Sequence, residues 1–165
     1  MSGAEVIRGH AWVFGDRIDT DVLAPGWAMK LPPEELASHC LTAVRPEFAE
    51  RVARGDVVVA GDGFGIGSSR EQAAQSLKAL GVGAVLARGF ARIFYRNALN
   101  LGLPVLTFPH AGEIADGEAV SVDPGSGRVE AGDRSWTVPP IPPDLLAMVR
   151  AGGLMAQLRA ERGLA

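Results

Sequence analysis

Three short apolar runs, separated by two stretches of helical pattern, constrain the fold of this chain more than any other feature. The runs are 57–60, 83–87 and 104–108, and the helical stretches are 70–80 and 90–101. Strands that are apolar along their whole length and alternate with helices are typical of a parallel sheet with right-handed crossovers. Gly81 and Gly102 stand where helices commonly end. The sequence therefore predicts an α/β fold with a central βαβαβ unit.

Further elements are expected on both sides of this unit. Before it we predict a strand, a polar loop and two short helices, over 6–14, 15–26, 33–40 and 46–52. After it the pattern alternates and predicts an antiparallel β meander, over 117–122, 128–131 and 134–138. Prolines end the meander, and two C-terminal helices are expected over 144–150 and 154–162. Because the meander is too short to carry a core of its own, we expect one domain over 1–165.

The composition is that of an ordinary globular protein. Hydrophobic residues make up 47% of the chain, and the formal net charge of -3 gives no indication of nucleic-acid binding. No apolar run is long enough to span a bilayer, and the first fifteen residues lack the apolar core of a signal peptide. Cys40, the single cysteine, cannot form an internal disulfide or hold a zinc site or iron–sulfur cluster alone. These features predict a cytoplasmic protein that does not bind membranes.

The segment that leaves the first apolar run is rich in glycine and ends in two serines and an arginine. It reads Gly-Asp-Gly-Phe-Gly-Ile-Gly-Ser-Ser-Arg-Glu-Gln-Ala over 61–73. Glycines such as Gly65 and Gly67 adopt backbone dihedrals closed to other residues and leave room for a ligand. A helix starting at Ser68 and Ser69 would direct unpaired N–H groups at the loop, and Arg70 would add a planar cation. The pattern predicts an anion site at the carboxyl end of a strand.

The loop does not match the common nucleotide-binding or nucleophile motifs. A P-loop would continue with lysine after its last glycine, whereas here serines and an arginine follow. The glycine spacing differs from the dinucleotide fingerprint, and Arg88 stands where that fold needs an acid. A G-x-S-x-G nucleophile elbow is absent from the sequence. On the residues alone, the loop is an anion site or a structural tight turn.

Other polar clusters carry weaker signals. Asp16, Asp19 and Asp21 have the spacing of a calcium loop but lack its glycine and distal glutamate, so we interpret them as a turn-rich loop or the lip of a site. The neighbours His39 and Cys40 have no further ligand residues at metal-binding spacing. The basic residues of the centre indicate an anionic ligand, an acidic partner or structural ion pairs. They are Arg70, Lys78, Arg88, Arg92 and Arg96.

Four blocks of the sequence together resemble the swivelling domain of the aconitase superfamily. They read Gly-Ile-Gly-Ser-Ser-Arg-Glu-Gln-Ala (65–73), Phe-Ala-Arg-Ile-Phe-Tyr-Arg-Asn-Ala (90–98) with Asn-Leu-Gly-Leu-Pro (100–104), Asp-Thr-Asp-Val-Leu-Ala-Pro-Gly (19–26) and Ala-Gly-Gly-Leu (151–154). The blocks follow the family's order over nearly the whole chain. In length and context they look most like the stand-alone small subunits of the 3-isopropylmalate dehydratase family, the isomerases of leucine biosynthesis.

This resemblance implies a swivelling β/β/α domain that forms half of a two-chain hydro-lyase. A separate large subunit would bind a [4Fe–4S] cluster with its own cysteines, and the present chain would hold no metal or cofactor. By position in the motif, Ser68 matches the general base that dehydrates a small hydroxy-dicarboxylate. Ser69 and Arg70 match residues that bind the substrate carboxylate, and Asp21 matches an acid near the active site. Gly65 would shape the loop together with Gly67.

The sequence departs from the family pattern at two loop positions and in the segment that contacts the variable part of the substrate. A cysteine often stands in place of Ile66, so its absence argues against a redox role, and an asparagine often stands in place of Gly63. The segment 25–33 often carries an arginine but here has Lys30 as its cation, which we expect to contact the substrate. Three apolar residues of this segment suit an isopropyl substituent. They are Trp27, Met29 and Leu31.

Several functions remain open at this point. The main prediction is the small subunit of an isopropylmalate isomerase, inactive without its large subunit, with homoaconitase-type or dimethylmalate-type dehydratases as alternatives. A second class of function is an anion-binding regulatory module, which would bind its ligand without a partner. A third is a structural assembly subunit, in which the serines are dispensable. The sequence also leaves open whether the isolated chain forms a homo-oligomer.

Overall fold

The computed structural model describes residues 6–163. Residues 1–5, which begin the segment expected to lack a signal peptide, and residues 164–165, the end of the expected domain, lie outside the described part. The strands are β1 (Ile7–Val13), β2 (Val57–Ala60), β3 (Ala84–Ala87), β4 (Val105–Thr107), β5 (Ala119–Asp123), β6 (Arg128–Ala131) and β7 (Arg134–Thr137). The helices are α1 (Thr20–Leu23), α2 (Pro33–Ala37), α3 (Phe48–Arg51), α4 (Glu71–Ala79), α5 (Arg92–Asn100), α6 (Pro143–Arg150) and α7 (Leu154–Glu161), with short 3-10 turns at Gly26–Ala28 and Ala111–Glu113.

One mixed sheet runs through the described residues, in the order β4-β3-β2-β1-β5-β6-β7. Strands β1 to β4 pair in parallel, and β5, β6 and β7 continue the sheet as an antiparallel meander beside β1. The predicted α/β fold, with its βαβαβ unit, meander and C-terminal helices, is confirmed. All four residues of β2 and of β3 are buried, which is the pattern of strands at the centre of a covered sheet.

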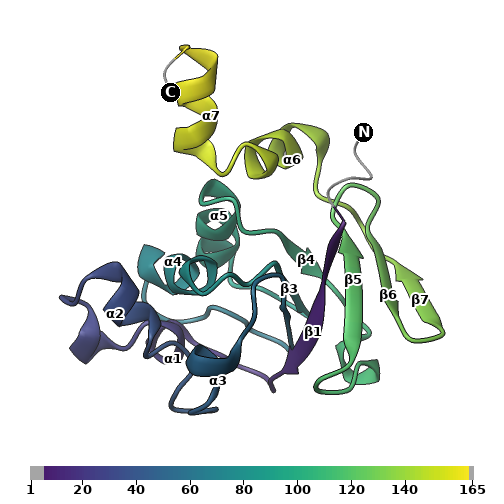
Figure 1. Cartoon of the computed structure of the whole chain (residues 1–165), viewed down its shortest axis with the longest axis horizontal. Coiled ribbons are helices and arrows are strands. Elements are labelled where there is room, and N and C mark those ends of the chain that lie inside the picture. Colours follow the sequence, from purple (N-terminus) through teal and green to yellow (C-terminus); the bar gives the residue numbers. More distant parts are fainter. Residues whose placement is uncertain (1–5, 164–165) are drawn as a thin grey trace.

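The helices that cross between the parallel strands pack together (Figure 1). Because β2, β3 and β4 are neighbours in chain order, right-handed crossovers place α4 and α5 on the same face of the sheet. Helix α4 contacts α1, α2 and α5, and α6 and α7 extend the helical layer beyond α5. The packing buries an apolar core that includes Phe48, Phe64 and Phe108.

Three local expectations differ from the structure. The polar loop predicted over 15–26 contains the one-turn helix α1, whose first N–H groups are capped by Asp19: its carboxylate accepts from the Val22 N–H at 2.9 Å. The helix predicted from residue 46 begins at Phe48. Ile93, an apolar residue of the predicted helix 90–101 that would be expected to face the core, is 53% exposed.

Candidate active site

The glycine-rich loop lies at the carboxyl end of β2, between the segments that follow β1 and β3. Ala60 and Ala87 are register partners, so the chain after β2 and the chain after β3 leave the sheet side by side. Backbone hydrogen bonds fix the loop to both neighbours: the Gly65 N–H donates to Ile18 O at 2.7 Å, and the Phe64 N–H donates to Gly89 O at 3.0 Å. The sequence prediction that the loop sits at a strand's carboxyl end is confirmed.

Gly65 allows the loop to contact α5 directly. Its φ is +83°, and a Cβ atom there would lie 2.3 Å from Phe94 Cβ, closer than side chains approach. Gly67 has φ +109°, and a Cβ there would lie 3.0 Å from Thr20 Oγ1. A backbone conformation in the left-handed region and the absence of a side chain are therefore both required at Gly65. The loop is held against α1 on one side and α5 on the other.

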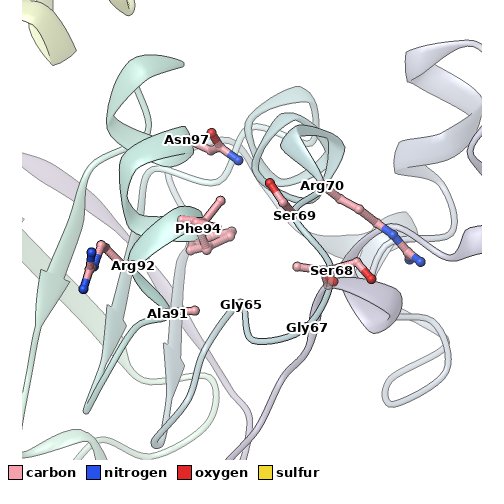
Figure 2. Close-up of a pocket in the computed structure, with 11 residues that line it drawn as sticks. Gly65, Gly67, Ser68, Ser69, Arg70, Ala91, Arg92, Phe94 and Asn97 are labelled. Atoms are coloured by element: carbon pink, nitrogen blue, oxygen red, sulfur yellow. The ribbon is translucent and has the colours of Figure 1, made fainter.

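A cavity of about 280 Å³ lies between this loop and α5 (Figure 2). Its walls come from α1, from the loop and the residue before α4, and from the first two turns of α5. The lining residues are Thr20, Gly65, Gly67, Ser68, Ser69, Arg70, Ala91, Arg92, Ile93, Phe94 and Asn97. The volume accommodates a small organic acid rather than a nucleotide.

Ser68 and Ser69 both line the cavity and are exposed at its edge. Helix α4 begins at Glu71, and Arg70, in an extended conformation, occupies the N-cap position without a side-chain cap. The helix therefore starts slightly later than the sequence pattern suggests, and the serine hydroxyls are not used to cap it. Because the first turn of α4 follows directly, its N–H groups add positive partial charge on this side of the cavity.

Arg70 is engaged in an ion pair within this chain. Its Nη1 donates to Asp21 Oδ1 and to Ala24 O, each at 2.9 Å. Asp21 Oδ1 also accepts from the Gly26 N–H at 2.9 Å. The hydrogen bond from Arg70, and then the one from Gly26, hold the pKa of Asp21 below its usual value. In Figure 2 the guanidinium points away from the cavity, toward α1. The structure thus brings Asp21 and Arg70 together, with Asp21 outside the cavity wall.

The segment expected to contact the variable part of the substrate lies outside this cavity. Lys30 is exposed and does not belong to the lining. Trp27, 73% exposed, contacts the rest of the chain through an edge-to-face arrangement with His39, at 4.6 Å between ring centroids. Met29 is partly buried against the core. This segment presents an uncovered aromatic surface beside the Asp21–Arg70 pair.

Sequence reasoning missed several members of the cavity wall. Thr20, Ile93 and Asn97 line it but were not predicted as site residues. The available signal was helical spacing, because Ile93 and Asn97 are four residues apart and share a face of α5. What was lacking was the rotation of the helix, which the contact between Phe94 and Gly65 sets.

The described residues offer no obvious place for a metal ion. Within 6–163, no three His, Cys, Asp or Glu side chains come together as ligands. Cys40 is fully buried, and burial raises the pKa of its thiol, which disfavours the thiolate needed for ligation. A [4Fe–4S] cluster therefore does not fit the donors that this chain provides. In the same range, no helix is long and apolar enough to cross a membrane.

Comparison with known proteins places these features in a family. A model described as the aconitase C-terminal domain matches residues 43–111. The 3-isopropylmalate dehydratase small subunit 1 of Methanopyrus kandleri is 47% identical over 161 residues, which cover 95% of each chain. The 3-isopropylmalate dehydratase small subunit of Moorella thermoacetica is 46% identical over 154 residues, covering 91% of this chain and 93% of the relative.

Two further matches extend the comparison. The methanogen homoaconitase small subunit of Methanothermobacter thermautotrophicus is 45% identical over 153 residues, 91% of this chain and 89% of the relative. The crystal structure of 3-isopropylmalate dehydratase (leuD) from Methanocaldococcus jannaschii superimposes with a TM-score of 0.89 at 39% identity, covering 95% of each chain. With such similarity over nearly its whole length, the chain belongs to the family of the 3-isopropylmalate dehydratase small subunits, part of the aconitase-type hydro-lyases.

Proposed function

We propose that this chain is the small subunit of a hydro-lyase that interconverts 2-isopropylmalate and 3-isopropylmalate by dehydration and rehydration, a step of leucine biosynthesis in the cytoplasm. The observation that carries the proposal is the 47% identity, over 95% of both chains, with a 3-isopropylmalate dehydratase small subunit. The cavity beside the serine loop supports it, because its volume suits a small hydroxy-diacid.

In this proposal, Ser68 acts as the general base. Dehydration of a hydroxy-diacid removes a proton from the carbon next to a carboxylate, and Ser68 Oγ takes that proton. Its deprotonated form is a poor resting species in water, but N–H groups at the start of α4 and a cover that excludes water would stabilise it. Rehydration from the other orientation moves the hydroxyl by one carbon and returns the proton, so the reaction has no net redox change.

Ser69 and Arg70 bind a substrate carboxylate in this scheme. The hydrogen bonds that Arg70 makes to Asp21 and Ala24 both come from Nη1. Since a guanidinium has five N–H donors, Nε and Nη2 remain to bind the two oxygens of a carboxylate. The ion pair with Asp21 then orients Arg70 rather than blocking it, and Lys30, on the segment 25–33 outside the cavity, contacts the variable part of the substrate.

The catalytic unit requires a large subunit. A [4Fe–4S] cluster, which this chain cannot ligate, would reside there and assist departure of the hydroxyl as a Lewis acid. Ser68 and Ser69 are exposed in this chain, so a partner surface is needed to cover and desolvate them. The isolated chain is accordingly expected to have negligible activity.

Reconstitution tests the proposal directly. The chain is co-expressed with the cluster-binding subunit of the same organism, purified without oxygen, and assayed by chromatographic separation of 2- and 3-isopropylmalate. We expect interconversion by the pair and none by either subunit alone. Failure of an intact, cluster-loaded pair to convert isopropylmalate would refute the assigned substrate.

A homoaconitase-type activity is the second candidate, because one relative at 45% identity is a homoaconitase small subunit. Its substrate replaces the apolar isopropyl group with a carboxylate chain. The segment 25–33 favours isopropylmalate, since it presents Trp27 and offers Lys30 in place of an arginine. A panel of isopropylmalate, dimethylmalate and homocitrate on the reconstituted pair ranks the substrates by kcat/KM. Saturable binding of dicarboxylates by the isolated chain, with no activity in the pair, would instead favour an anion-binding module.

A further inference from the structure

Asn97 is a polar residue that the fold does not explain. It lies in the middle of α5, is partly buried and lines the cavity. Among the hydrogen bonds within residues 6–163, its side-chain amide takes part in none. Asparagine is less favourable than alanine inside a helix, and no hydrogen bond within the described residues offsets this cost. A side chain with these properties is explained most simply by a ligand.

The direction of Asn97 is fixed by its neighbours on α5. Asn97 follows Phe94 by three residues, so the two share a face of the helix. Phe94 packs edge-to-face on Phe64 at 5.2 Å between ring centroids and stacks on Phe90 at 6.2 Å. Its contact with Gly65 leaves no room for a Cβ atom. This aromatic contact sets the rotation of α5, and therefore the place of Asn97, relative to the serine loop.

Figure 2 shows Asn97 and Ser69 on opposite walls, with the nitrogen end of the amide turned toward Ser69. The charged groups point elsewhere: the guanidinium of Arg70 toward α1, and that of Arg92 away from the cavity on its other side. The side-chain hydrogen-bonding groups directed between the walls are therefore neutral. Helices α4 and α5 also both begin at this cavity, so their first-turn N–H groups raise the local potential for an anion.

We propose that Asn97 is a substrate-binding residue, whose Nδ2–H donates to a carboxylate oxygen of the hydroxy-diacid from the wall opposite Ser68 and Ser69. This inference rests on the proposed function and adds to it a second wall of the half-site contributed by this chain. A carboxylate held between the walls accepts hydrogen bonds from the Ser69 hydroxyl and from the Asn97 amide, while the guanidinium of Arg70 stays at the edge of the cavity, on the side of α1.

The test uses the reconstituted two-subunit enzyme and a matched control on the same helix. Asn97→Ala removes the donor, and Asn97→Asp keeps the size but places a negative charge toward a dianionic substrate. Asn100→Ala and Asn100→Asp make the same changes at an exposed position of α5 outside the cavity. Melting temperature and co-purification with the large subunit are measured for all four, because neither should depend on an amide that the fold does not use.

We expect Asn97→Ala to raise KM roughly tenfold or more, the effect of losing a hydrogen bond to a charged group. Asn97→Asp should lower kcat/KM further, by on the order of a hundredfold, because repulsion adds to the lost donor. Both Asn100 variants should match the wild type. If KM is unchanged for both Asn97 variants in an active enzyme, the inference is overturned and the proposed function stands. The same holds if a loss of kcat/KM is fully explained by a lower melting temperature or by impaired assembly.

A binding measurement decides the case in which the reconstituted pair converts none of the substrates. The isolated wild-type chain is titrated with 2-isopropylmalate and followed by two-dimensional NMR, with potassium chloride at equal ionic strength as reference. The inference expects saturable shifts of the Asn97 side-chain amide together with the amides of Ser68 and Ser69, and none for Asn100. An Asn97 amide that does not respond, or responds no more than that of Asn100, refutes it.

Discussion

At the residue scale, the cavity separates neutral groups from charged ones. The hydroxyls of Ser68 and Ser69 and the amide of Asn97 line it, while Arg70 is held at its edge by Asp21. In a site that a partner must close, this arrangement limits the desolvation cost of the empty state, because the cation already has a counter-ion. Substrate can then add its carboxylate to free donors of Arg70 without first breaking the pair.

Replacing Ser68 by alanine tests the assigned base. In the reconstituted enzyme, kcat should fall by roughly 10²–10⁴-fold, the usual loss when a general base is removed, with assembly unchanged. The measurement is the initial rate of isomerisation at saturating substrate. Ser135→Ala, on the exposed face of β7, serves as control. Normal turnover by a Ser68→Ala enzyme that assembles fully would exclude Ser68 as the base.

Asp56 is a buried carboxylate with a structural role and a predictable pH dependence. It accepts hydrogen bonds from the His10 N–H at 3.0 Å, the Trp12 Nε1–H at 2.9 Å and the Ala53 N–H at 2.8 Å. Burial raises the pKa of Asp56, but these hydrogen bonds outweigh it and leave the pKa below its usual value. A lowered folded-state pKa stabilises the fold above the unfolded-state pKa, and this contribution is lost as pH falls through the folded-state pKa.

Asp56→Asn should therefore destabilise the chain near neutral pH, because one acceptor becomes a donor facing a donor. We expect a loss of about 1–3 kcal/mol in the free energy of unfolding, measured by denaturant titration. The difference from the wild type should shrink below about pH 4, as the wild-type carboxyl is protonated. Asp133→Asn, at an exposed turn, is the control. A pH-independent difference would contradict the assignment.

At the scale of the elements, the glycine loop and α5 behave as one unit. The loop's backbone bonds to the segments before α1 and after β3, and Gly65 packs on Phe94. The strand register brings these segments together at the carboxyl edge of β2 and β3. A parallel sheet places its ligands at such an edge because the loops there are adjacent and the helices that follow start there.

Gly65→Ala should force the glycine loop and α5 apart. The left-handed conformation costs about 1–2 kcal/mol for a residue with a Cβ, and overpacking against Phe94 adds about 1–3 kcal/mol. We expect the free energy of unfolding to fall by about 2–5 kcal/mol and isomerase activity to fall with it, since Ser68 and Asn97 would be displaced. Gly112→Ala is the control, because a Cβ there meets nothing within 4 Å. A Gly65→Ala variant of wild-type stability would show that the loop does not depend on this contact.

At the scale of the whole molecule, α6 and α7 pack on α5, and one side chain adds hydrogen bonds to this contact. Lys78, on α4, donates from Nζ to Leu101 O at the end of α5 and to Gly152 O, after α6, at 3.1 Å. The ammonium thus binds the carbonyl ends of two helices, where a cation is favourable. Helix α7 continues beyond this point (Figure 1). Its residues Leu154 and Met155 are exposed.

Lys78→Met should loosen this connection while keeping the aliphatic stem. We expect a loss of about 1–3 kcal/mol in the free energy of unfolding, from hydrogen bonds of a charged donor to two carbonyls. Cleavage by trypsin after Arg150 or Arg159 should accelerate, as measured by mass spectrometry over time. Lys30→Met, which changes the other lysine at an exposed position, controls for loss of charge. Equal proteolysis of both variants would show that Lys78 does not hold α6 and α7.

Much of the architecture could be predicted because its signals are local. Apolar residues that recur at every second position, or at about every fourth, identify strands and helices. Glycines such as Gly81 and Gly102 mark the ends of both crossover helices. Helix α1 was not predicted because its single turn needs more than the local cap from Asp19. The Thr20 N–H also donates to Ile66 O, in the glycine loop. A turn of this length does not persist without such tertiary contacts.

The α/β class, the family and the serine loop could be inferred from the sequence, since apolar periodicity and a contiguous motif are properties of neighbouring residues. The groups that face the loop are known only from the folded chain. The pairing of Arg70 with Asp21 joins residues 49 positions apart, and the place of Asn97 depends on the rotation of α5 against Gly65. The direction of a side chain on a helix depends on the surface against which the helix packs. Because that surface comes from distant residues, the direction cannot be predicted from one segment alone.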